Sequence, residues 1–223
     1  MDVMRNRIRP ILYSLRQWRC RFSEELTEVE IRPGDYHFSE KLDADQLKDG
    51  WMSFGACETW GGRDRHFWFR TKVVIRKEWA GKEVRVTLNT GADDIWNTDN
   101  PQIMAYKNGI LSGTMDMNHQ DLILAEEAEE AEVFELVFYA YSNSENPTNF
   151  FHLKAAVYDR EIADLYYDLK VPFEAAELCS EEDLDRIEAM KFLNTAISGL
   201  DLRKPGSEEF YQSVREVREY VKK

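Results

Sequence analysis

Apolar and polar residues alternate in the middle of the chain and recur at helical spacing towards its two ends. Val84, Val86 and Leu88 alternate with polar residues, which is typical of a strand with one buried face. Residues 66–75 are rich in aromatic and β-branched side chains, and we predict a strand buried on both faces. Further strands are expected at 133–141 and 150–158. Because the strands follow one another without intervening helices, the pattern predicts an antiparallel β-sandwich.

The pair Asn108-Gly109 gives the clearest local signal, because it lies between two apolar runs within residues 100–121. A two-residue type I′ turn requires positive φ at both central positions, and Asn-Gly satisfies this requirement better than almost any other pair. The sequence therefore predicts a β-hairpin centred on these two residues.

The first 22 residues have helical apolar spacing and carry six arginines against one acid. Pro10 lies in this segment, either in the first turn of a helix or at a kink. The segment is expected to be an amphipathic helix packed on the acidic remainder of the protein. An oligomerisation or interdomain arm, and less favourably a membrane-surface helix, are the alternatives.

Helical spacing returns after residue 159. Its apolar positions are Ile162, Leu165, Tyr166, Leu169, Leu184, Ile187, Met190, Leu193, Phe210, Val214 and Val217. We expect Pro172 to interrupt the first helix, and residues 180–183 to start the next one with a capping-box-like sequence. That helix is expected to end near Gly199, and Ser207 should cap the last helix.

These patterns divide the chain into three parts. Residues 1–49 hold the first helix and a linker with room for one short strand, residues 50–158 the sandwich, and residues 159–223 a helical segment. The predicted fold is mainly β with flanking helices, and the sandwich is of jelly-roll or galactose-binding-like type.

Composition supports a folded protein and excludes some partners. The 223 residues are 43% hydrophobic and 13% aromatic, which is enough for a full core. The net charge of −13 disfavours nucleic acid and anionic membranes as partners. Three widely spaced cysteines and the lack of a signal-peptide pattern predict reduced thiols and a cytoplasmic location.

Asp116, Asn118 and His119 follow the second strand of the expected hairpin. Three hydrogen-bonding side chains at a strand exit form either a recognition loop or a solvated turn, and the residues alone leave both open.

Two more features suggest ligands. The loop from Asp93 to Asn100 is rich in carboxylate and amide oxygens, which suit Ca²⁺, although it lacks EF-hand spacing and local Asx turns explain it equally. Four tryptophans lie within 46 residues, at positions 51, 60, 68 and 96. Trp60 and Trp96 are candidates for covering a sugar ring, with core packing as the alternative for this group.

Motifs for catalysis are absent from the sequence. It has no phosphate-binding glycine loop, no nucleophile elbow and no pair of histidines at zinc-ligand spacing. His66 is expected to be a structural histidine. We assign no catalytic residue and no metal ligand.

Several segments together resemble the N-terminal β-sandwich region of cytosolic and bacterial α-mannosidases of glycoside hydrolase family 38. They are Ser53–Gly55, Trp60–Gly62, His66–Arg70, Asn100–Gln102, Tyr106–Gly109, Met115–His119, Leu165–Leu169, Leu193–Arg203 and Glu209–Ser213. In that family the region precedes a catalytic barrel with a His-x-His metal segment and an aspartate nucleophile at a zinc site. This sequence contains no His-x-His.

The resemblance implies a non-catalytic N-terminal part of a retaining, zinc-dependent α-mannosidase that hydrolyses terminal α-mannosides in glycan breakdown. Zinc and the catalytic domain would then belong to a part of the polypeptide outside this chain. The chain alone is expected to be inactive. It would support the catalytic barrel, make subunit contacts, or send its loop at Asp116 to His119 towards the substrate cleft. A stand-alone carbohydrate-binding module and an oligomerisation domain are the other two hypotheses.

Overall fold

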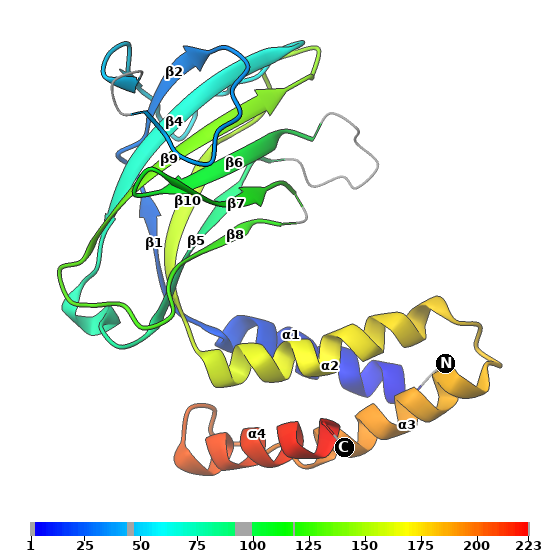
Figure 1. Ribbon diagram of the computed structural model, residues 1–223. Helices are drawn as coiled ribbons and strands as arrows, with labels where there is room; N and C mark the ends of the chain where they lie inside the picture. The colour runs from blue at the N-terminus through cyan, green and yellow to red at the C-terminus, as the bar shows by residue number, and fades with distance from the viewer. Residues whose placement is uncertain (1–2, 44–46, 92–99, 118, 223) are drawn as a thin grey trace. The chain divides into compact units, whose positions relative to one another are not determined.

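The computed structural model describes residues 3–43, 47–91, 100–117 and 119–222 (Figure 1). The chain divides into two compact units. The β unit spans Phe22–Val157, and the helical unit combines Met1–Arg21 with Tyr158–Lys223. The mainly β fold with accompanying helices, predicted from the sequence, is therefore confirmed.

The β unit consists of two sheets (Figure 1). The four-stranded sheet has the order β1 (Cys20–Leu26), β10 (His152–Tyr158), β5 (Glu83–Asn89) and β8 (Asp121–Ala125). The six-stranded sheet has the order β3 (Met52–Ser53), β2 (Glu30–Gly34), β4 (Arg65–Val74), β9 (Val133–Ser142), β6 (Gln102–Lys107) and β7 (Ile110–Met115). Pairing within the six-stranded sheet is antiparallel throughout.

Alternating side chains of both sheets form one core between them. Phe69 on β4 and Phe138 on β9 are fully buried there, as is Val86 on β5. The ring of Phe69 stacks on that of Phe151 with centroids 3.8 Å apart. On the other face of β4, Trp68 is also buried, at 5% exposure. The sandwich is therefore confirmed. Burial on both faces of this strand holds at Trp68 and Phe69 but not at Lys72 and Val74, which are exposed on the outer face.

The Asn108-Gly109 hairpin forms as predicted. Lys107 pairs with Ile110, and φ is +52° at Asn108 and +78° at Gly109. The backbone N–H of Asn108 donates to the Glu135 carbonyl at 2.8 Å, and its side-chain oxygen accepts the Glu135 N–H at 2.9 Å. The turn is thereby joined to β9 as well as closing its own hairpin.

The stretch expected to be a linker contains strands of both sheets. β1 occupies residues 20–26, and β2 pairs with β4 from Glu30↔Arg70 to Gly34↔His66. Within β2 only Ile31 is buried, so the segment has too few inward side chains to show a period of two. Its place in the sheet depends on pairing with a strand that lies more than 30 residues further along the chain.

The helical unit contains α1 (Val3–Trp18), α2 (Arg160–Leu178), α3 (Leu184–Ser198) and α4 (Glu208–Val221) (Figure 1). Ile8 and Leu15 of α1 are fully buried and share a core with residues of the other three helices. Arg5 and Arg9 both pair with Glu177 of α2, at 2.5 and 2.9 Å. The basic first helix is thus packed on acidic neighbours, as expected. In the described part of the chain, no helix combines the length and apolarity that crossing a bilayer requires.

The expected break at Pro172 is wrong, because α2 continues through it to Leu178. Proline removes one backbone donor from a helix, but buried Leu169 and Phe173 on either side hold this segment in the helical core. The next helix begins at Leu184, and its N-cap is Asp183, the last residue of the expected start at 180–183. As expected, the third helix ends at its C-cap Gly199, and Ser207 caps the start of the last helix.

Two glycines with positive φ provide a test of how the β unit is packed. A Cβ at Gly61, where φ is +123°, would lie 2.8 Å from Nδ2 of Asn149 and 2.9 Å from Oγ of Ser142, both buried. A Cβ at Gly109 would meet nothing within 4 Å.

We expect Gly109→Ala to lower the free energy of unfolding by about 1 kcal/mol through strain alone, and Gly61→Ala by about 3 kcal/mol. Denaturant titration of both variants checks this, and equal losses would contradict the packing around Gly61.

Candidate ligand-binding site

The chain between β2 and β3 crosses the outer face of the six-stranded sheet. Residues 35–43, here called the strap, reach the β6–β7 hairpin and bond to it. The Leu42 N–H donates to the Gly109 carbonyl at 2.9 Å, and the Leu111 N–H donates to the Glu40 carbonyl at 2.8 Å. These two bonds hold the strap against the hairpin in the manner of a short antiparallel bridge.

Aromatic side chains lie beneath the strap. Trp68, Tyr106 and Tyr139 form a small buried cluster on this outer face. The ring of His37, from the strap, lies 4.8 Å from Trp68 and 5.8 Å from Tyr139, measured between centroids. The Tyr106 hydroxyl donates to the Ser39 carbonyl at 2.8 Å. The centre of this face is therefore a second apolar layer covered by the strap.

Beside the strap lies a cavity of about 730 Å³, here called the aromatic pocket. Its ring-bearing residues are Tyr36, His37, Phe38, His66, Tyr139 and Tyr141. Two of them are largely open to solvent, since Tyr36 is 81% and Phe38 70% exposed. Its polar side chains are Asp64, Gln102, Thr114 and Asp116. The pocket thus combines accessible ring faces with groups that can donate and accept hydrogen bonds.

A hydrogen-bonded group joins the strap to the floor of the aromatic pocket. The Tyr139 hydroxyl accepts the His37 backbone N–H at 3.1 Å and lies 2.6 Å from Nδ1 of His66. Burial raises the pKa of Tyr139, so its hydroxyl stays protonated at neutral pH. His66 is therefore a hydrogen-bonded histidine held in place by its neighbour, as predicted from the sequence.

His37 is held in its uncharged form. Burial lowers the pKa of its imidazole, because the charged ring would lose hydration. Its Nε2 is a buried polar atom with no hydrogen-bonding partner among the described residues. His37 thus belongs both to the strap and to the wall of the aromatic pocket.

Two of the predicted site residues, Asp116 and His119, are hydrogen-bonded to each other, and the first of them lines this pocket. Oδ1 of Asp116 accepts the His119 backbone N–H at 2.7 Å and lies 3.1 Å from Nδ1 of His119. Asp116 lines the aromatic pocket, and the His119 side chain is 77% exposed. The loop is thus a local hydrogen-bonded turn that also carries a carboxylate to a cavity. Asn118 lies outside the described residues.

Trp60, one of the two candidate tryptophans, does not join this site. Trp60 is 2% exposed, and its indole N–H donates to the Phe150 carbonyl at 3.1 Å. It packs in the core between the sheets, so a sugar-covering role for its ring is incompatible with the structure. Trp96 and the possible calcium ligands at positions 93–99 lie outside the described residues.

The rings of the aromatic pocket were missed by the sequence analysis. Tyr36 and Phe38 come from the stretch assigned to a linker, where nothing in the local pattern indicates a binding wall. His66 and Tyr141 pair directly across β4 and β9, on the face opposite the core. The sequence did carry one signal for them: both strands have aromatic residues at odd and at even positions. A strand with one solvated face would instead carry polar residues at every second position.

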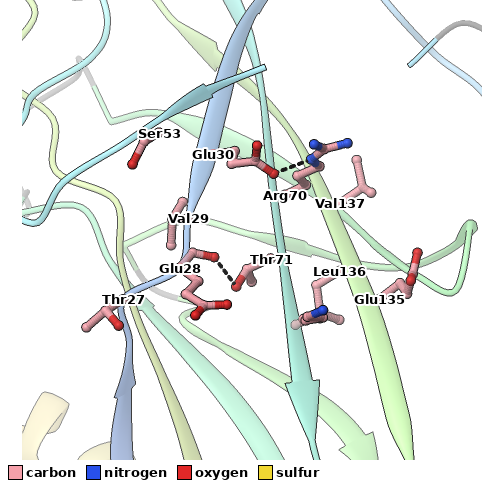
Figure 2. Close-up of a pocket in the computed structure, with 11 residues that line it drawn as sticks. Thr27, Glu28, Val29, Glu30, Ser53, Arg70, Thr71, Glu135, Leu136 and Val137 are labelled. Carbon is pink, nitrogen blue, oxygen red and sulfur yellow. Dashed lines mark hydrogen bonds and ion pairs between the residues drawn. The ribbon is translucent and has the colours of Figure 1, made fainter. Parts of the chain in front are cut away.

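A second hollow, of about 610 Å³, lies where the chain enters β2, and Figure 2 shows its lining. Nε of Arg70 donates to Oε2 of Glu30 at 2.5 Å, and this bond lowers the pKa of Glu30. The Arg70 guanidinium also lies over the ring of Trp51, 4.4 Å from its centroid. Glu28, Lys72 and Glu135 add further charges of both signs, and no aromatic residue is among the described residues that line the hollow. Without ring faces to cover a ligand, it is the weaker candidate.

The described residues do not fit a zinc site. No group of three or more His, Cys, Asp or Glu side chains in ranges 3–43, 47–91, 100–117 and 119–222 is arranged to hold a metal ion.

No protein-family model matches the sequence, and no curated protein matches it. Among solved structures, the chain is similar to a Bacteroides fragilis protein described as a candidate beta-galactosidase, with 13% identity and a TM-score of 0.43. That alignment covers 62% of this chain and 23% of the other. The chain is also similar to Bacteroides uniformis beta-glucuronidase 2, with 12% identity, a TM-score of 0.42, and coverage of 60% and 18%.

A beta-glucuronidase from Ruminococcus gnavus aligns with 10% identity and a TM-score of 0.42, covering 62% of this chain and 30% of that one. The matched region is thus less than a third of each of these glycoside hydrolases. At such identities and TM-scores, the likeness carries no argument about activity. The function has to be sought in the residues of this chain.

The burial of His37 predicts a specific dependence of stability on pH. Its pKa in the folded protein lies below the usual value of about 6.5, so the unfolded chain binds more protons in the window between the two values. The contribution of His37 to the free energy of unfolding is therefore full above about pH 6.5 and is lost as the pH falls through that window. We expect the wild type to lose more free energy of unfolding between pH 7.5 and pH 5.5 than His37→Gln does. Denaturant titrations at the two pH values, with exposed His119→Gln as control, test this, and an unchanged loss in His37→Gln would contradict it.

Proposed function

We propose that the β unit binds carbohydrate in the aromatic pocket. The observation that carries this proposal is the meeting of exposed aromatic faces with hydrogen-bonding side chains in one cavity of about 730 Å³. Sugars present C–H groups on their ring faces and hydroxyls around their edges. Aromatic rings cover the former, and carboxylate, amide and hydroxyl side chains meet the latter.

The pocket has the size and rigidity that such a ligand needs. Its volume lies within the range usual for small-molecule sites, roughly 300–1,000 Å³. His66 and Tyr141 stand on β4 and β9, paired in the sheet, and Tyr139 bonds to His66. This floor is therefore ordered by strand pairing before a ligand arrives, which limits the entropy lost on binding.

The finer proposal is that the chain is the non-catalytic part of a retaining, zinc-dependent α-mannosidase. The resemblance of its segments to that family supports this, and one of them, Met115–His119, brings Asp116 to the pocket rim. The catalytic domain, with its zinc, would then be the partner of this chain within one polypeptide. The β unit would support that domain and present the loop at Asp116 to the glycan, and the chain could also make subunit contacts.

A stand-alone carbohydrate-binding module is the second candidate, because the pocket is complete within the β unit. Asp64, His66, Asp116 and Tyr141 all belong to residues 22–157. Such a module would use the same side chains, so sugar binding alone does not separate the two candidates.

Binding is tested by titration of methyl α-D-mannopyranoside and α-mannobiose, followed by ligand-observed NMR and calorimetry. We expect saturable binding that is weakened about tenfold by Tyr141→Ala or Phe38→Ala, since each removes a ring face worth about 1.4 kcal/mol. Tyr13→Ala, at an exposed tyrosine of α1, is the matched control and should leave binding unchanged. A flat titration at millimolar sugar would contradict the proposal.

The parent enzyme is tested by the mass of the native polypeptide, detected with an antibody to this chain. We expect a polypeptide several times longer than 223 residues that hydrolyses aryl α-mannosides, while the purified chain does not. A native polypeptide of 223 residues would favour the stand-alone module. Metal-dependent hydrolysis by the chain alone would contradict a non-catalytic role.

A further inference from the structure

We propose that the aromatic pocket binds an oligosaccharide of at least two linked sugars that lies across the strands of the six-stranded sheet. This inference rests on the proposed function and adds the size and the orientation of the ligand. It follows from two features that run in the same direction, which are a row of side chains on the sheet and the path of the strap beside it.

The floor of the pocket is built from side chains of four neighbouring strands. Tyr141 of β9 pairs with His66 of β4 on one side and with Gln102 of β6 on the other. Directly opposed residues of antiparallel strands carry their side chains on the same face, so these three form one row. The next row adds Met104 of β6, which pairs with Thr114 of β7. All five residues line the pocket, so its floor extends from β4 to the edge strand β7.

The strap crosses the sheet in the same direction as this row. The ring of Tyr36 lies 6.4 Å from that of His66 on β4, measured between centroids. Three residues later, the Ser39 carbonyl accepts the hydroxyl of Tyr106 on β6 at 2.8 Å. Phe38 lies between these two contacts along the chain and also lines the pocket. The strap is therefore a side wall that follows the row from β4 towards β6, with an exposed ring at each of two places.

This surface is longer than one sugar. Neighbouring strands lie about 4.8 Å apart, so the floor from β4 to β7 spans about 14 Å. A pyranose is a six-membered ring, close in size to the ring of a single tyrosine. One sugar at the β4 end would leave Phe38, Gln102 and Thr114 without a contact, whereas a second sugar linked to it along the row would reach them.

The two ends of the row differ in their chemistry. At the β4 end, the rings of His66 and Tyr141 lie 5.0 Å apart, and the ring of Tyr36 stands at 85° to that of His66. These rings form an aromatic corner that suits the C–H face of a sugar. At the β6 end, Gln102 is exposed and offers two amide donors and an acceptor oxygen, and the exposed Thr114 adds a hydroxyl. The first sugar is thus expected to stack in the corner, and the next to form hydrogen bonds with Gln102.

The length of the ligand tests this inference on the full chain. By calorimetry we expect at least one of the α1,2-, α1,3- and α1,6-linked mannobioses to bind about tenfold more tightly than methyl α-D-mannopyranoside, because the second sugar adds contacts. Gln102→Ala should reduce this ratio to about threefold or less. Gln212→Ala changes an exposed glutamine of α4 and should leave the ratio as in the wild type.

NMR spectroscopy provides a second readout, because it shows where each sugar lies. The side-chain amide signal of Gln102, assigned by its loss in Gln102→Ala, should shift on addition of the tighter mannobiose and stay in place on addition of methyl α-D-mannopyranoside. The ring signals of Tyr141 should shift with both ligands, since both place a sugar in the aromatic corner.

The outcomes separate this inference from the proposed function. If every mannobiose binds no more tightly than methyl α-D-mannopyranoside, the extended site is overturned while sugar binding stands. If the gain persists in Gln102→Ala, or if the Gln102 amide signal does not shift with mannobiose, the placement across the strands is overturned. If none of the sugars binds, the proposed function itself fails, and this inference fails with it.

Discussion

The pairing of β4 with β9 is the contact on which the β unit depends. It runs over ten residue pairs, from Arg65↔Ser142 to Val74↔Val133, and joins strands about 60 residues apart in the chain. Because side chains alternate with a period of two, this single register decides both faces at once. Phe69 and Phe138 are sent into the core, while Trp68 and Tyr139 are sent to the outer face. A slip by one residue would exchange the two sets.

The centre of the outer face is aromatic, so its exposure to water would be unfavourable. The strap covers it and bonds to the hairpin through Leu42 and Leu111. His37 of the strap becomes half-buried, with its Nε2 fully enclosed, and the rings of Tyr36 and Phe38 lie beside an open cavity. The path of the strap thus has two consequences: it covers the apolar cluster, and it forms one wall of the aromatic pocket. The aromatic pocket lies where the strap leaves the edge of this second apolar layer uncovered.

The helical unit has its own core and its own electrostatics. Helix α1 and the helices after residue 160 lie at opposite ends of the sequence, yet they bury one set of apolar side chains. Arg218 of α4 pairs with Asp164 and Asp168 of α2, as Arg5 and Arg9 of α1 do with Glu177. The basic residues of α1 and α4 are thus paired with acidic residues of the same unit.

The sequence by itself determined the features that arise from local physics. Asn108-Gly109 made its turn because positive φ is accessible to these residues, and Ser207 capped its helix because its hydroxyl accepts a nearby backbone N–H. Only the tertiary structure decided that Trp60 is core, that α2 continues through Pro172, and which rings meet in the pocket. Those outcomes depend on burial against residues far away in the chain. A local pattern carries no information about which distant surface will cover it.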